Sequence, residues 1–272
     1  MGVLNVTPDS FSDGGRYLSP AAALEHGLRL IEEGAAIIDV GGESTRPGAE
    51  PVSVQEEERR VLPVIEGLCR RTQAVISVDT SRPEVMRQAA AAGAGLLNDV
   101  RALSAPGALE AAVASGCAVC LMHMRGEPRT MQAAPTYHDV VAEVGEFLAA
   151  RARACRGAGL TQDRILLDPG FGFGKTLEHN LELLRRLHDL TALGLPLLVG
   201  LSRKSMLAGL TARGPGERLA GSVALATIAV LGGARVIRAH DVAATVDALK
   251  VAAAVLKEGG SCLPEQVPAV LG

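Results

Sequence analysis

The chain has 272 residues, 48% of them hydrophobic, and it carries a formal net charge of −3. This length suits one large domain, and the hydrophobic content is sufficient for an extensive core. The small negative charge provides no general field that would attract nucleic acid or an anionic membrane, so any anionic ligand must be held by local groups.

The N-terminal region has no basic stretch followed by an apolar one, and no stretch approaches about eighteen uninterrupted apolar residues. We therefore expect a cytoplasmic protein. The five cysteines are an odd number in a chain too long to need disulfide staples, so we expect reduced thiols. Cys117 and Cys120 have the spacing of a metal knuckle. In an extended run, however, residues three apart point to opposite faces, so we expect no zinc or redox role there.

Eight short apolar runs alternate along the chain with helix-like segments, and nearly every run ends in polar residues. The runs end near Asn5, at Gly41–Arg46, at Asp79, at Asn98–Asp99, at Met122–His123, at Asp168, at Ser202–Lys204 and at Arg238–His240. This alternation predicts an α/β fold, a single-domain (β/α)8 TIM barrel over residues 1–258, followed by an irregular tail over 259–272. Because barrel enzymes build their sites from the loops after the strands, these polar residues are expected to share one pocket.

Between the runs, helix starts are predicted at Ser19–Pro20 and, with capping-box spacing, at Ser53–Glu56 and Ser81–Glu84. The run Glu56–Leu68 has the apolar spacing of an outer helix. The run Leu219–Leu231 is apolar on almost every side. It is therefore expected to be a helix covered by the barrel and, on its other side, by either a subunit interface or further chain.

The loop after the first run, Asn5–Gly15, holds two carboxylates and an amide, which are hard oxygen ligands suited to a metal-bound anion. Its Phe11, together with Phe171 and Phe173, lies in a predicted loop rather than in the core. Aromatic rings in such loops favour a flat ligand that stacks on them.

The loop after the second run, Gly41–Gly48, contains Arg46, whose guanidinium can form paired hydrogen bonds with a carboxylate or phosphate. An exposed turn arginine is the alternative interpretation. Asp39 and Glu43 can either contact a ligand or brace the mouth of the barrel, and neither is assigned to the site.

Three further strand ends carry Asp79, Asn98 and Asp168. Each of them alone could cap a helix. Together they offer two carboxylate acceptors and one amide, which match a heterocycle with a guanidine-like edge of N–H donors beside a carbonyl.

The segment Gly170–Thr176 looks superficially like a phosphate-binding P-loop, but Pro169 stands where that motif requires glycine. We therefore expect Lys175 to be a solvated loop lysine. The seventh and eighth runs end in Ser202–Lys204 and Arg238–His240, at the part of such barrels where phosphate is commonly held, and these residues supply donors for a diphosphate. His123 remains open between a ligand contact and a satisfied barrel residue.

Together these motifs resemble the dihydropteroate synthase family of pterin-binding enzymes. The most specific stretches are Asn5–Gly15 (NVTPDSFSDGG) and Gly42–Gly48 (GESTRPG). The remaining motifs follow in the family's order: Val78–Thr80, Asn98–Asp99, Met122–Met124, Asp168–Lys175, Ser202–Lys204 and Arg238–His240. The resemblance implies a barrel transferase that joins 6-hydroxymethyl-7,8-dihydropterin diphosphate to 4-aminobenzoate and releases diphosphate. It also implies Mg²⁺ as cofactor and a homodimer, with small-molecule substrates and neither nucleic acid nor membrane as partners.

The resemblance also implies roles for individual residues. The implied pterin-binding residues are Asp79, Asn98, Asp168, Lys204, Met122 and Phe173, and the implied diphosphate-binding residues are Asn5, Arg238 and His240, with Mg²⁺ near Asn5. The implied aminobenzoate-binding residues are Thr45, Arg46 and Ser202, while Phe11 and Asp13 match a loop that closes over the reactants. Family members usually carry a short extension before the first strand, which here follows Met1 directly, so we expect the fold to persist with some loss of stability.

Three alternatives are weighed against this interpretation. A methyltetrahydrofolate methyltransferase would share the pterin pocket but would not need Ser202–Lys204, Arg238 and His240 for a diphosphate. A non-catalytic pterin-binding module would lack the anion-binding and loop residues. A phosphate-binding aldolase would place its Schiff-base lysine inside the barrel, whereas Lys175 and Lys204 lie in predicted loops.

Overall fold

The structure is a computed structural model that describes residues 1–7, 19–44, 51–126, 131 and 135–256. Its strands are β1 (Gly2–Asn5), β2 (Ile37–Gly41), β3 (Val75–Asp79), β4 (Leu96–Asp99), β5 (Ala118–Met122), β6 (Ile165–Asp168), β7 (Leu198–Val199) and β8 (Val236–Ile237). Its α-helices are α1 (Pro20–Glu32), α2 (Val54–Cys69), α3 (Pro83–Ala91), α4 (Ala108–Ser115), α5 (Val140–Gly157), α6 (Leu177–Arg185), α7 (Leu187–Thr191), α8 (Met206–Thr211), α9 (Leu219–Leu231) and α10 (Val242–Leu256). The predicted tail, 259–272, lies outside the described residues.

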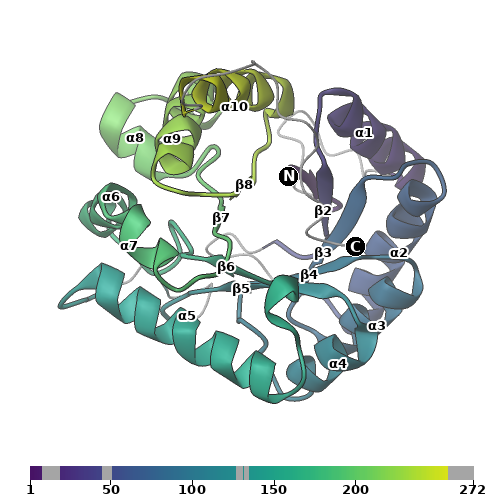
Figure 1. Cartoon of the computed structure of the whole chain (residues 1–272). Coiled ribbons are helices and arrows are strands. Elements are labelled where there is room, and N and C mark those ends of the chain that lie inside the picture. The colour runs from purple at the N-terminus through teal and green to yellow at the C-terminus, as the bar shows by residue number, and fades with distance from the viewer. Residues whose placement is uncertain (8–18, 45–50, 127–130, 132–134, 257–272) are drawn as a thin grey trace.

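The strands close into a barrel surrounded by the helices (Figure 1). Strands β1 to β6 form one parallel sheet, and β7 pairs in parallel with β8. Parallel bridges between Leu167 and Leu197 and between Gly2 and Ala239 join these two sheets at both edges. The backbone N–H of Val3 donates to the carbonyl of Ala239 at 3.0 Å, so β1 meets the end of β8. The predicted (β/α)8 barrel is confirmed.

The core has two layers, as a closed sheet covered by helices requires. The smaller layer, made of Leu96, Ala118, Cys120, Leu166 and Leu198, comes from alternate positions of neighbouring strands. The larger layer includes Cys117 and packs between strands and helices. The thiols of Cys117 and Cys120 therefore lie in different layers, as predicted.

Two of the predicted helix starts are confirmed and one is wrong. Ser19 accepts a hydrogen bond from the backbone of Ala22 at the start of α1, and Ser53 accepts one from Glu56 at the start of α2. Helix α3 instead begins at Pro83 without a side-chain cap. The Ser81 hydroxyl instead donates to the buried carboxylate of Asp99, which also accepts hydrogen bonds from the backbone of Arg101 and Leu103.

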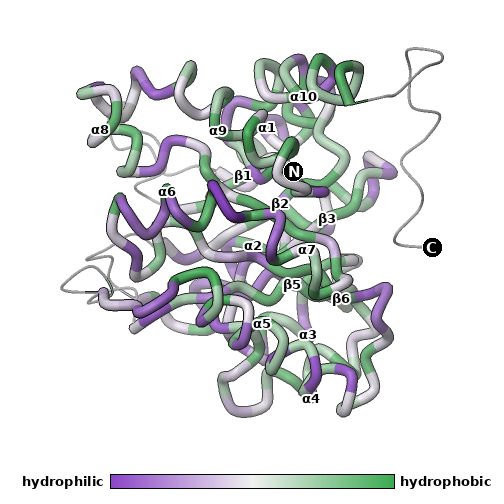
Figure 2. The backbone as a smooth tube through the Cα atoms, turned by 60° about the vertical axis from the view of Figure 1, so that its left-hand side comes forward, coloured by the Kyte–Doolittle hydropathy of each residue, from purple (hydrophilic) through white to green (hydrophobic). Residues whose placement is uncertain are grey.

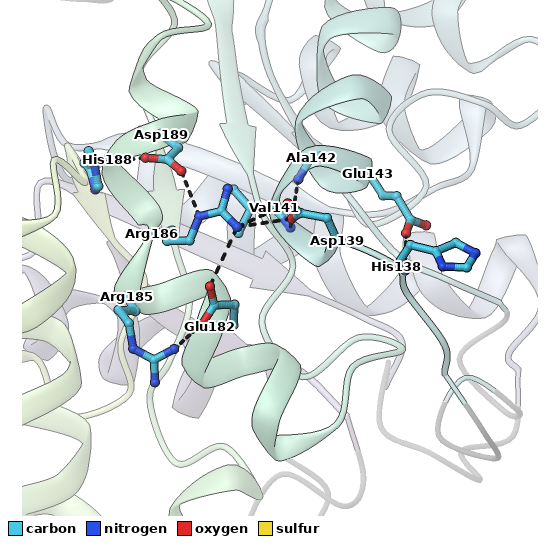
Figure 3. A network of polar contacts seen from close by, with 10 residues as sticks. All are labelled: His138, Asp139, Val141, Ala142, Glu143, Glu182, Arg185, Arg186, His188 and Asp189. Atoms are coloured by element: carbon cyan, nitrogen blue, oxygen red, sulfur yellow. Dashed lines mark hydrogen bonds and ion pairs between the residues drawn. The ribbon is translucent and has the colours of Figure 1, made fainter.

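A surface network ties α5 to α6 and α7 (Figure 3). Arg186, at the junction between α6 and α7, forms ion pairs with Asp139 at 3.2 Å, with Asp189 at 2.9 Å and with Glu182 at 3.7 Å. Asp139 also caps α5 by accepting a hydrogen bond from the backbone of Ala142 at 3.0 Å. These groups are exposed, so the network orients the helices while adding little stability. Within the described residues, no helix is both long and apolar enough to cross a bilayer.

The turn after β6 depends on a glycine that packs directly against the segment after β5. Gly170 has a φ of +69°, and a Cβ added there would lie 1.8 Å from the carbonyl oxygen of His123. Gly194 has the same φ of +69°, but an added Cβ would meet nothing within 4 Å. A substitution at Gly194 therefore measures only the free-energy cost of placing a residue with a side chain in the left-handed backbone conformation, about 1–2 kcal/mol.

We expect Gly170→Ala to lower the melting temperature much more than Gly194→Ala, because only the first substitution adds a clash with backbone. Thermal unfolding followed by circular dichroism measures both variants. Equal losses would show that the turn after β6 can move away from His123 at no cost.

Candidate active site

Most of the predicted pterin-binding residues lie at the carboxyl ends of neighbouring strands. In the strand register Asn5 pairs with Gly41, Gly41 with Asp79, Asp79 with Asn98, and Met122 with Asp168. Gly41 leaves room between its neighbours, because a Cβ added there would lie 3.5 Å from Asn5 Oδ1 and 3.6 Å from Asp79 Cβ. The strand ends therefore present one row of amide and carboxyl groups toward the mouth of the barrel.

A carboxylate–arginine cluster, formed by Asp39, Asp79 and Arg238, joins opposite sides of this mouth. Arg238 Nε donates to Asp39 Oδ2 at 2.6 Å, and its Nη2 donates to Asp79 Oδ2 at 3.0 Å. Burial opposes the charge on Arg238, but the two carboxylates outweigh it and raise the pKa of the guanidinium. Arg238 is therefore charged at every pH at which the protein is folded.

Within this cluster, burial raises the pKa of Asp79 to about 7, and the nearby charge of Asp39 adds to the rise while Arg238 opposes it. The Asp79 side chain remains 12% exposed, so a ligand in the mouth of the barrel can reach it. Asp79 therefore changes charge near neutral pH at the position where a ligand would bind.

Asp39 is a site residue that the sequence left unassigned. It is fully buried and accepts hydrogen bonds from Ser77 Oγ at 2.6 Å and from Asn98 Nδ2 at 3.0 Å, in addition to that from Arg238. Because the Asn98 amide nitrogen donates to Asp39, its oxygen remains an acceptor for a ligand. Asp39 thus orients two of the predicted site residues, Asn98 and Arg238, and braces the mouth of the barrel. Asp39 lies two residues before Gly41, the end of β2, so it is on the same face of the strand as Gly41. This spacing is the feature of the sequence that indicates an inward-facing side chain.

A second part of the site combines Lys204, Phe173 and Asp168. The Lys204 ammonium lies 4.2 Å from the centre of the Phe173 ring, a cation–π distance. Burial lowers the pKa of Lys204 to about 8, although the charge of Asp168 opposes this. Burial also raises the pKa of Asp168, whose carboxyl accepts a hydrogen bond from the backbone of Gly170 at 2.7 Å. A half-buried aromatic face, a cation and a carboxyl therefore meet beside the row of strand ends.

Two predictions about the turn after β6 are wrong. Phe171 is 1% exposed and belongs to the core, so only Phe173 of these two phenylalanines offers a face to a ligand. Lys175 is 2% exposed and is not a solvated lysine. Glycines with positive φ at 170, 172 and 174 curl the turn over the lysine, which then finds its acceptors inside the turn.

The predicted anion-binding end contains Ser202 and His240. The Ser202 hydroxyl oxygen lies 3.1 Å from both the backbone nitrogen and Nδ1 of His240. Burial, together with the charges of Arg238 and Arg203, lowers the pKa of His240 to about 3, so its ring is neutral. Arg203 is paired with Asp241 at the start of α10, and it contributes less to an anion site than the sequence indicated.

The other predicted residues are placed as follows. Met122 is buried at the end of β5 and Asn5 is partly exposed at the end of β1. Phe11, Asp13, Thr45 and Arg46 lie outside the described residues, so their predicted roles remain predictions.

A (β/α)8 barrel with carboxyl and amide groups at its mouth and cations beside them has the groups expected of a pterin-binding barrel. Residues 1–240 match the family model described as "Pterin binding enzyme". The chain is 57% identical over 256 residues to the dihydropteroate synthase of Escherichia coli K12, with 94% of this chain and 91% of the relative covered.

Solved structures give the same result. The Yersinia pestis dihydropteroate synthase with a sulfonamide drug complex superposes with a TM-score of 0.90 at 52% identity, covering 93% of this chain and 92% of that chain. The Xanthomonas albilineans enzyme with 4-aminobenzoic acid gives 0.89 at 55% identity, covering 95% and 93%. The chain belongs to the dihydropteroate synthase family.

The resemblance recognised in the motifs is therefore confirmed, and the methyltransferase, binding-module and aldolase alternatives are not supported. The chain is a transferase that condenses 6-hydroxymethyl-7,8-dihydropterin diphosphate with 4-aminobenzoate to give 7,8-dihydropteroate and diphosphate.

Proposed function

We propose that the pterin ring binds against the strand ends, with its guanidine-like edge toward Asp79, Asn98 and Asp168. Asn98 supports this assignment because Asp39 fixes its amide with the oxygen free to accept a hydrogen bond. Phe173 and Met122 line the ring, and Lys204 donates to its carbonyl. The observation that carries the proposal is the hydrogen bond between Arg238 and Asp79. It places a cation that can bind an anion beside a carboxylate that can bind the pterin.

The diphosphate is assigned to Asn5, Arg238 and His240. Arg238 uses Nε and one N–H of Nη2 for the two carboxylates, so Nη1 and the second N–H of Nη2 remain for an anion. The Ser202 hydroxyl can donate to Nδ1 of the neutral His240, which leaves the proton of that ring on Nε2 as a further donor.

Magnesium fits this end through the amide oxygen of Asn5. Among the residues with described positions, no three His, Cys, Asp or Glu side chains lie close enough to hold a metal ion by themselves. One protein oxygen with phosphate and water oxygens is the donor set that Mg²⁺ commonly takes in phosphate sites. Bound there, the ion would neutralise part of the charge on the leaving diphosphate.

The aminobenzoate is assigned to Thr45, Arg46 and Ser202, with Arg46 pairing with its carboxylate. Ser202 lies beside His240, so this placement puts the aminobenzoate next to the diphosphate that it replaces. Phe11 and Asp13 are assigned to a loop that closes over both substrates and excludes water.

In the reaction, the bond between the pterin methylene carbon and the diphosphate oxygen breaks, and its electron pair leaves with the diphosphate. Arg238 and His240 stabilise that departing anion, while the carboxyl groups of Asp79 and Asp168 favour the cationic pterin. The arylamine nitrogen then forms the new bond to carbon and transfers one proton to the released diphosphate. No covalent bond to the protein is needed.

The assignment is tested by diphosphate release from the pterin substrate with Mg²⁺, with and without 4-aminobenzoate. We expect release that depends on aminobenzoate and yields dihydropteroate in equal amount, and loss of release when Mg²⁺ is chelated. Release at the same rate without aminobenzoate would contradict capture of the cation by the arylamine.

The protein is further proposed to form a cytoplasmic homodimer. Leu219, Ile228 and Leu231 of α9 are exposed, as are Val251 and Val255 of the adjacent α10. Helix α10 is coloured mostly as hydrophobic in Figure 2. A second copy of the chain would remove these side chains from water. Sedimentation velocity tests this, because a concentration-independent monomer would contradict the dimer.

A further inference from the structure

Lys175 is a buried cation whose contacts join the segments that follow β5 and β6. Its Nζ donates to the carbonyl of Gly170 at 2.8 Å and to that of Phe173 at 3.2 Å, and it lies 3.0 Å from His123 Nδ1. Three acceptors match the three N–H donors of an ammonium group. The cluster therefore satisfies a charged Lys175 completely, with no N–H left for a ligand.

His123 serves this cluster as a neutral acceptor. Burial, and then the charge of Lys175, lowers the pKa of His123 to about 3. Because Nδ1 accepts from Lys175, the ring proton is assigned to Nε2. The ring also packs edge-on against Phe147 at a centroid distance of 5.0 Å, so it has little freedom to turn.

The two carbonyls that accept from Lys175 belong to the turn that carries the ligand-facing groups. Gly170 donates its N–H to the Asp168 carboxyl at 2.7 Å, and Phe173 donates its N–H to the Gly170 carbonyl at 3.1 Å. The ring of Phe173 lies under Lys204. A shift of this turn would therefore move Asp168 and Phe173 together.

We infer that Lys175 is a positioning residue of the pterin pocket, which holds Phe173 and Asp168 in place through the carbonyls of their turn, with His123 as its fixed neutral partner. The inference rests on the pterin pocket proposed above. Lys175 touches no substrate. Lys175 is expected to affect binding of the pterin and not of the aminobenzoate, because its contacts lie within the segments after β5 and β6.

A kinetic readout distinguishes this role from simple stabilisation of the fold. Burial lowers the pKa of Lys175 to about 7, Lys204 adds to the lowering, and Asp168 opposes it. Lys175→Met would leave the three buried acceptors without their donor, so some loss of folding free energy is expected as well. A smaller folded fraction lowers the apparent kcat but does not change the Michaelis constants of the folded enzyme, so a rise in the KM for the pterin diphosphate alone is the expected signature.

The test is Lys175→Met, with steady-state kinetics in which each substrate is varied while the other is saturating. We expect the KM for the pterin diphosphate to rise about tenfold, the effect of one displaced hydrogen-bonded group, with the KM for aminobenzoate unchanged. Lys250→Met removes the charge of an exposed lysine on α10 and is the matched control. Equal changes in both Michaelis constants, or no change, would overturn the inference.

Two variants at His123 keep the inference testable if Lys175→Met does not fold. His123→Gln retains an acceptor for Lys175 and should keep the pterin KM close to that of the unmodified enzyme. His123→Phe keeps a flat ring but removes the acceptor, and it should raise the pterin KM. An unchanged pterin KM in His123→Phe would overturn the positioning role.

Asp79→Ala in the same assay separates this inference from the pocket assignment. If Asp79→Ala leaves pterin binding intact, the proposed pocket is wrong. If Asp79→Ala abolishes binding while the Lys175 and His123 variants behave like the unmodified enzyme, the pocket stands and only the positioning role fails.

Discussion

Replacement of Asp79 by alanine is expected to weaken binding of the pterin about a hundredfold, because each hydrogen bond between a ligand N–H and a charged acceptor contributes about 1.5–3 kcal/mol. The substitution removes an acceptor for the pterin N–H donors and leaves Arg238 with Asp39 as its remaining carboxylate partner in the cluster. Isothermal titration calorimetry with a pterin ligand measures the loss directly. Unchanged affinity would exclude Asp79 from the pocket.

The pH dependence of this residue has a defined sign. Because the pKa of Asp79 is raised to about 7, its carboxylate becomes available to N–H donors only as the pH rises through about 7, and pterin affinity should increase over that range. In the unfolded chain Asp79 ionises near its ordinary pKa of about 4. The folded state therefore binds more protons between pH 4 and 7, and Asp79 makes folding less favourable as the pH rises through this window.

Asp79→Asn separates the two effects, because asparagine has a similar shape but no charge. The melting temperature of Asp79→Asn minus that of the unmodified protein should be larger at pH 8 than at pH 5. This gain in stability should occur even though pterin binding is lost. A stability difference that does not depend on pH would show that Asp79 ionises normally in the folded protein.

Replacement of Arg238 by alanine is expected to weaken binding of the pterin diphosphate about a hundredfold, because charge-assisted hydrogen bonds to the anion are lost. The affinity for the pterin alcohol should fall by about tenfold or less. This smaller loss arises because the substitution leaves the carboxylates of Asp39 and Asp79 without their arginine partner. Calorimetry with both ligands gives the ratio. Equal losses would assign Arg238 to the pterin end alone.

Arg238→Lys is the matched control for charge. It keeps a cation but has no planar group that can reach two carboxylates and an anion together. We therefore expect an intermediate loss for the diphosphate ligand. Full retention would show that charge alone, and not the shape of the guanidinium, matters at this position.

The barrel and the positions of the strand-end residues can be predicted because each strand corresponds to a short apolar run that ends in a polar residue. Asp79, Asn98 and Asp168 follow from this local pattern, since parallel strands deliver their carboxyl ends to the same face. Closure between β8 and β1 also follows, because eight strand–helix units fill a complete barrel.

The errors concern residues whose surroundings depend on how a loop folds back. Lys175 and Phe171 are buried because glycines at 170, 172 and 174 curl the turn against the segment after β5. The spacing of apolar residues in the sequence does not reveal how such a turn curves. Asp39 cannot be assigned from the sequence because its partners lie in or directly after three other strands: Ser77 in β3, Asn98 in β4 and Arg238 after β8.

The position of Arg238 beside Asp79 has a consequence for inhibitors if the proposed subsites are correct. A ligand at the proposed pterin subsite and a free diphosphate are then expected to change each other's affinity, because Asp79 and the diphosphate both contact the guanidinium of Arg238. Thermodynamic linkage requires that the factor by which diphosphate changes the affinity of such an inhibitor equals the factor by which the inhibitor changes the affinity of diphosphate. We therefore expect the potency of such an inhibitor against this enzyme to depend on the concentration of released diphosphate.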